Sequence, residues 1–142
     1  SKFQIAQTPD FEKHLNRYNV IHIDMQKFLG RTKNVHEMLD FLQKRVLKEM
    51  KQTFSGIEPE ETSLIIALED LYGQCEEKFI FIIDEWDSIF RVHRDNATAP
   101  KEYLDFLRDL LKGQPYVALA YMTGILPIKK YGQHSALNMF KE

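Results

Sequence analysis

The sequence predicts an α/β fold, a three-layer α/β/α arrangement built around a short parallel sheet. Three short apolar runs carry this prediction, and each ends in polar residues: residues 20–24, 79–84 and 116–123. Short runs rich in β-branched and aromatic residues are typical of strands buried on both faces. The segments between them place apolar residues at helical spacing. Right-handed crossovers through these helices then give a parallel sheet with helices on both faces.

Length and composition fit one domain, residues 1–142, with a net charge of −2. Such a charge gives no bulk attraction to nucleic acid or to a membrane surface. The only cysteine is Cys75, which excludes an internal disulfide and a cysteine-rich zinc site. No apolar run approaches the roughly 18 residues of a membrane helix. The sequence begins without a secretory segment, so a cytoplasmic location is expected.

The first two elements are expected to be a short helix and a strand. Thr8 caps the helix, Pro9 opens it, and it ends near Tyr18. The strand at 20–24 ends in Asp24, which either caps the next loop or faces a site. His22 is better explained by a neighbouring hydrogen bond than as a metal ligand, because no other ligand type stands at a suitable spacing.

Two helices are expected to form the crossover to the next strand, after a polar connection over residues 25–33. The first starts at Asn34, with Glu37 in the position of a capping box, and runs to Phe54. The second starts at residues 58–61, where a proline and acids suit a first turn, and ends at Gly73.

The strand at 79–84 is expected to be central, because five apolar residues are followed at once by Asp84 and Glu85. Ligands of parallel sheets collect beyond the carboxyl ends of the strands. This is the Walker B pattern, in which Asp84 holds Mg²⁺ through water and Glu85 activates the attacking water. The same residues also fit a buried strand whose polar end merely caps the next turn.

The remaining elements lead to a third strand end. A short helical turn around Trp86 and a polar loop at 91–99 precede a helix that opens at Pro100 and closes at Gly113. The strand that follows ends in Thr123. The hydroxyl of Thr123 is able to bond a phosphate or the attacking water, or only the local backbone.

Taken together, the three strand ends resemble the AAA-ATPase-like family of bacterial P-loop proteins, many of which carry a C-terminal nuclease-like domain of the PD-(D/E)XK type. The matching segments are residues 18–24, 79–87 and 121–125. The family usually has tyrosine where this chain has Trp86. The resemblance implies ATP and Mg²⁺ as cofactors, Asp84 as the metal ligand, and Glu85 and Thr123 as catalytic residues, with Thr123 at the sensor-1 position that reads the γ-phosphate.

The sequence lacks the Gly-x-x-x-x-Gly-Lys-Ser/Thr loop of these ATPases. In the family this loop lies upstream, on the first strand, and supplies the N–H groups and the lysine that hold the phosphates. We therefore expect an internal part of an ATPase domain, without its Walker A strand and last strand. Such a chain alone is expected to bind ATP weakly or not at all.

The resemblance also implies the strand order 5-1-4-3-2. The three strands present would then be neighbours, with 79–84 in the middle and 116–122 at an exposed edge. Unpaired apolar edges tend to pair with another chain. Self-association through residues 116–122 is therefore expected.

Two other functions remain open. One is a non-catalytic α/β interaction domain, which a Gly-Lys-Ser/Thr loop encoded before Ser1 would argue against. The other is a metal-dependent nuclease, since acids at strand ends also bind Mg²⁺. A nuclease would need a further Glu-x-Lys or Asp-x-Asp, and the spacing of Asp84 and Asp87 does not put both on one strand face. We rank the ATPase first and the nuclease last.

Overall fold

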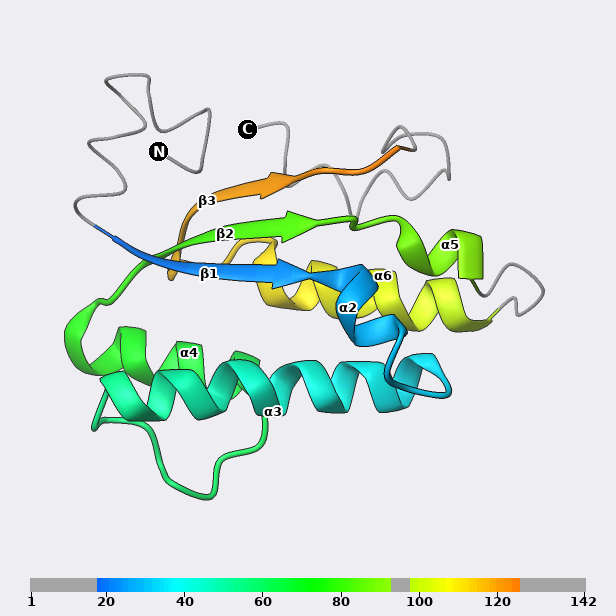
Figure 1. Ribbon diagram of the computed structural model, residues 1–142. Coiled ribbons are helices and arrows are strands. Elements are labelled where there is room, and N and C mark those ends of the chain that lie inside the picture. The colour runs from blue at the N-terminus through cyan, green and yellow to red at the C-terminus, as the bar shows by residue number, and fades with distance from the viewer. Residues whose placement is uncertain (1–17, 93–97, 126–142) are drawn as a thin grey trace.

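Three parallel strands form the sheet in the computed structural model, which describes residues 18–92 and 98–125 (Figure 1). They are β1 (Asn19–Asp24), β2 (Phe79–Asp84) and β3 (Val117–Met122). β2 lies in the middle and pairs in parallel with both neighbours. The predicted α/β class, the three strands and the central position of residues 79–84 are therefore confirmed.

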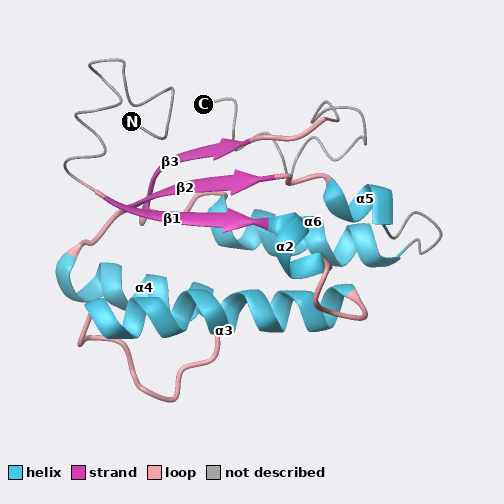
Figure 2. Cartoon of the chain, viewed as in Figure 1, coloured by secondary structure: helices cyan, strands magenta, loops and turns pink. Residues whose placement is uncertain are grey.

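The described helices all lie on one side of the sheet (Figures 1 and 2). Between β1 and β2 come α2 (Met25–Leu29), α3 (Val35–Thr53) and α4 (Leu64–Cys75), and between β2 and β3 come α5 (Ser88–Val92) and α6 (Thr98–Leu111). Because the strand order β1-β2-β3 advances in one direction, both right-handed crossovers place their helices on the same face of the sheet. The expectation that these crossovers cover both faces of the sheet is therefore wrong for the described residues, where they cover one face. The helix expected from Thr8 lies outside the described residues.

Burial differs between the strands. Phe79 to Ile83 are all buried in β2, with alternate residues pointing toward the helices. In β1, Ile21 and Ile23 are buried while Val20 and His22 are exposed. The prediction that each strand is buried on both faces is thus right for β2 and wrong for β1, whose outward positions are exposed, and for β3, whose residues are all half-buried. None of the helices in the described ranges is long and apolar enough to span a membrane.

The helix starts follow the available caps. Asn34 accepts a hydrogen bond from the Glu37 N–H at 2.8 Å, as predicted for α3. The predicted start at residues 58–61 is wrong, since α4 begins at Leu64 behind the Ser63 cap. The carbonyls of Pro59 and Glu61 instead accept hydrogen bonds from the Lys51 ammonium.

Two further boundaries differ from the expectation. Gly73 does not end α4, which runs to Cys75 and is closed by Glu76 in the left-handed conformation, with φ 57°. The Glu76 N–H donates a hydrogen bond to the Tyr72 carbonyl, so α4 ends there without a glycine. Residues 25–33, expected to be a polar connection, include α2, because Asp24 caps a helical turn there.

Candidate functional site

The predicted polar strand ends meet at one edge of the sheet. Asp24 and Asp84 are the last residues of β1 and β2 and are register partners. Thr123 directly follows β3, and its Oγ1 donates a hydrogen bond to Asp84 Oδ1 at 2.8 Å. The parallel topology thus brings together an acid and a hydroxyl that are 39 positions apart in the chain.

Asp84 is held as an anion by two neighbours. His22 Nε2 lies 2.5 Å from Asp84 Oδ2, because His22 points from β1 to the same face of the sheet. Partial burial works to raise the pKa of Asp84, but the hydrogen bonds from His22 and Thr123 and the charge of His22 outweigh it and leave that pKa below its usual value. The side chain of Asp84 is still 36% exposed, so solvent reaches it.

Glu85 turns away from Asp84. Its φ of 56° places it in the left-handed region, which a residue other than glycine adopts infrequently. Its N–H donates to Thr123 Oγ1 at 3.4 Å, while its Oε1 accepts a hydrogen bond from Arg91 Nη2 at 3.0 Å. The structure therefore brings the backbone of Glu85 to Thr123 and its carboxylate to Arg91.

Arg91 also faces a second, fully buried acid, Asp87. Arg91 Nη1 lies 3.2 Å from Asp87 Oδ1, an ion pair without hydrogen-bond geometry. Asp87 Oδ2 accepts a hydrogen bond from the Ile125 N–H at 2.9 Å. The sequence pattern predicted no role for Asp87 or Arg91. Their spacing of four residues, next to the helical turn predicted around Trp86, was the signal that could have indicated the pair.

The acidic turn after β2 is fixed from several sides. The Trp86 N–H donates to the Thr123 carbonyl at 3.0 Å, and the Trp86 carbonyl accepts the Tyr103 hydroxyl. Burial, with a smaller effect of the Asp87 charge, raises the pKa of Tyr103 well above its usual value, so the phenol remains a donor. A Cβ added at Gly124 would lie 2.4 Å from Asp87 Oδ1. Glycine at that position therefore allows the end of β3 to approach the turn.

The donor set suits a cation that needs few protein ligands. In residues 18–92 and 98–125, no three His, Cys, Asp or Glu side chains are grouped to hold a metal ion. Mg²⁺ usually takes one or two carboxylates and completes its shell with water and phosphate oxygens. An anionic, solvent-accessible Asp84 next to Asp24 fits that requirement.

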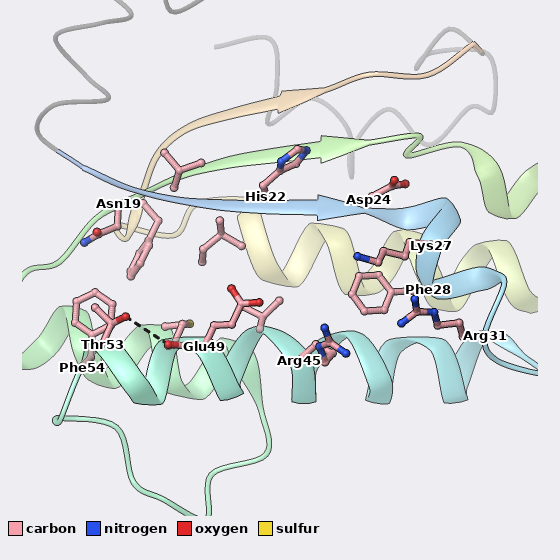
Figure 3. A pocket seen from close by; sticks show the side chains of 15 residues that line it. Asn19, His22, Asp24, Lys27, Phe28, Arg31, Arg45, Glu49, Thr53 and Phe54 are labelled. Atoms are coloured by element: carbon pink, nitrogen blue, oxygen red, sulfur yellow. Dashed lines mark hydrogen bonds between the residues drawn. The ribbon is translucent and has the colours of Figure 1, made fainter. Parts of the chain in front are cut away.

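A cavity lies beside these strand ends, between β1, α2 and α3, and both Asp24 and His22 line it (Figure 3). Its volume is about 450 Å³, and its lining combines apolar side chains with several basic ones. Neither Glu85 nor Thr123 lines it. The cavity therefore adjoins the strand-end site through Asp24 and His22 without including Asp84, Glu85 or Thr123.

Comparison with known proteins gives one match. A family model described as "Predicted AAA-ATPase" matches residues 1–133 of the chain. That range contains all three strands and the residues Asp24, Asp84, Glu85 and Thr123. The comparisons with curated proteins and with solved structures give no match.

Proposed function

Because the chain belongs to the AAA-ATPase-like family, we propose that it supplies the Mg²⁺-binding and water-activating residues of an ATP-hydrolysing domain. The observation that carries the proposal is the contact between Thr123 Oγ1 and Asp84 Oδ1. It places a hydroxyl donor beside an anionic acid where ligands of parallel sheets bind. A bound Mg²⁺ would neutralise phosphate charge at this edge.

Each residue has a proposed role. Asp84 holds Mg²⁺ through water, which its lowered pKa favours because the carboxylate stays ionised. Thr123, whose single hydroxyl hydrogen is donated to Asp84 in this structure, would turn that hydrogen toward the γ-phosphate when ATP is bound. Glu85 activates the attacking water: its side chain is 41% exposed and reaches solvent, although Arg91 binds it in this structure. Catalytic hydrogen bonds are often not formed until substrate is bound, so this geometry is compatible with the role.

The groups that hold the triphosphate are proposed to lie outside these 142 residues, which contain no Gly-x-x-x-x-Gly-Lys-Ser/Thr loop. Without such donors, Asp84 and Glu85 repel the phosphates unless Mg²⁺ bridges them. A protein made of these residues alone is therefore expected to bind ATP weakly or not at all. Submicromolar ATP binding to it, measured by calorimetry, would contradict this expectation.

The test is Mg²⁺-dependent ATP hydrolysis by the full-length protein. Asp84→Asn removes the negative charge and should lower the hydrolysis rate at limiting Mg²⁺ by about 10- to 100-fold. Asp70→Asn is the matched control, because Asp70 is exposed on α4 and far from the strand ends in sequence. Equal Mg²⁺ dependence of both variants would contradict the role of Asp84.

A second candidate is a non-catalytic interaction domain, favoured by the engagement of both Glu85 and Asp87 with Arg91. Acids that only stabilise a turn would be arranged in this way. ATP hydrolysis by the full-length protein in the presence of Mg²⁺ distinguishes the two functions, because an interaction domain hydrolyses no ATP.

A further inference from the structure

The cavity beside β1 is a groove along the outer edge of the sheet. Residues from both faces of β1 line it, since Ile21 points to the helices and Val20, His22 and Asp24 point to the other side. A space bordered by both faces of a strand reaches the edge of that strand. Across from β1, the groove is closed by α2 and α3 (Figure 3). We call this feature the β1 groove.

Basic side chains gather at one end of the β1 groove. Lys27 from α2, Arg31 just after α2, and Arg45 from α3 all line it, and Figure 3 shows them on the side toward Asp24. All three are exposed, and none forms an ion pair or a side-chain hydrogen bond with another described residue. Like charges held together repel one another unless an anion joins them.

The two acids in the lining, Asp24 and Glu49, offset only part of the charge of the three basic residues. Asp24 caps α2 through Oδ1, which accepts from the Gln26 N–H at 3.1 Å. Glu49 lies farther along α3, toward Phe54 (Figure 3). The basic end is therefore available to carboxylates from outside.

The opposite end of the β1 groove is apolar. Met50, Phe54 and Phe79 line it near the start of β1. The rings of Phe54 and Phe79 meet edge to face, with centroids 5.8 Å apart. This end suits uncharged side chains, so the groove has two chemically different halves along one strand.

The strand itself offers backbone groups. Within the described part of the chain, β1 pairs only with β2, so its other edge opens on the groove. Its six residues span roughly 20 Å. An extended peptide can add a strand to such an edge and place alternate side chains in the pockets beside it. A compact small molecule would leave most of this edge unused.

We propose that the β1 groove binds an extended acidic peptide of a partner protein, which adds a strand to β1. Its uncharged residues would occupy the end near Phe54, and its carboxylates would meet Lys27, Arg31 and Arg45. This recognition requires no nucleotide hydrolysis, because Asp84, Glu85 and Thr123 do not line the groove, which adjoins the strand-end site only through Asp24 and His22.

Fluorescence anisotropy with the full-length protein tests the proposal. The probe is a labelled synthetic peptide in which valine and threonine alternate and aspartates follow. One control peptide replaces the aspartates by lysines, and another carries N-methyl groups on alternate residues, which block strand pairing. The acidic peptide should bind at least about tenfold more tightly than either control.

Two protein variants locate the site. Arg45→Glu should weaken binding of the acidic peptide by about three- to tenfold. Lys44→Glu is the matched control: it lies next to Arg45 on α3, is exposed, and does not line the groove. Circular dichroism of both variants verifies that α3 is intact.

Four results would overturn the proposal. The first is no measurable binding of the acidic peptide at about 1 mM, and the second is an equal effect of Arg45→Glu and Lys44→Glu on binding. The third is undiminished binding of the N-methylated peptide. The fourth is tighter binding of an oligothymidylate than of the acidic peptide. The last result would assign the basic residues to nucleic-acid phosphates. Weaker peptide binding by Arg45→Glu but not by Lys44→Glu, with unchanged ATP hydrolysis, would support the β1 groove independently of the proposed ATPase function.

Discussion

Thr123 and Asp84 lie side by side at the carboxyl ends of β3 and β2, with the Thr123 hydroxyl donating to Asp84 Oδ1 at 2.8 Å. The same hydroxyl accepts from the Glu85 N–H at 3.4 Å. One side chain therefore contacts both acids of the strand-end pair. A change at Thr123 should alter the site without removing either acid.

Thr123→Val should slow ATP hydrolysis by the full-length protein by about 10- to 100-fold, because valine keeps the shape and loses the hydroxyl. Thr123→Ser should retain most of the rate. Thr62→Val is a control at an exposed position before α4. The measurement is kcat at saturating ATP and Mg²⁺. A Thr123→Val enzyme as fast as the wild type would exclude a role for this hydroxyl.

Asp87→Ala should lower the free energy of unfolding by about 1–3 kcal/mol, because the Ile125 N–H loses its acceptor and Arg91 loses a buried ion-pair partner. Urea unfolding followed by circular dichroism measures the change. Asp70→Ala, at an exposed position of α4, should stay within about 0.5 kcal/mol of the wild type. If both variants unfold at the same urea concentration, the buried ion pair contributes nothing measurable.

Acid should weaken the fold partly through Asp84. The pKa of Asp84 is lower in the folded chain than in the unfolded one, so the folded chain binds fewer protons. Its contribution is therefore present above the usual aspartate pKa and is lost as pH falls through the lower, folded value. Between about pH 5 and about pH 3 the wild type should lose more stability than Asp84→Asn. Parallel pH dependence of the two proteins in urea unfolding would contradict this.

β3 is proposed to be a site of self-association. All six of its residues are half-buried, and among the described strands it pairs only with β2. The Thr123 N–H bonds inward to the Ile83 carbonyl, so by alternation the N–H of Ala120 points away from β2. Ala120→Pro removes that donor and should shift a dimer to monomer in sedimentation velocity. A wild-type chain that is monomeric at all concentrations would contradict the proposal.

The sequence was sufficient to predict the three strands and the edge of the sheet at which their carboxyl ends lie together. Short apolar runs ending in Asp24, Asp84 and Thr123 predict parallel strands, and parallel strands bring their carboxyl ends to one edge. The proximity of Asp84 and Thr123 follows from this topology, while the hydrogen bond between their side chains does not. The hydrogen bond at His22 was also expected, though its partner was not.

Side-chain directions at the turn could not be predicted. The positive φ of Glu85 sends its carboxylate toward Arg91, and no residue type in the pattern signals that backbone state. The sequence offered more than one possible first residue for α4. The Lys51 ammonium binds the Pro59 carbonyl, which keeps that segment outside the helix, and Ser63 then caps the first turn. The β1 groove joins Arg31 and Arg45 from separate elements, so no local spacing reveals it.

The most direct test of the strand-end site is Glu85→Gln in the full-length protein, with ATP binding and phosphate release measured in parallel. Glutamine keeps the size of the side chain and cannot accept a proton from water. We expect ATP binding to be retained and hydrolysis to fall by about 10²- to 10⁴-fold, while Glu58→Gln, at an exposed position, leaves both unchanged. Undiminished phosphate release by Glu85→Gln would contradict the assignment of Glu85 as the residue that activates water.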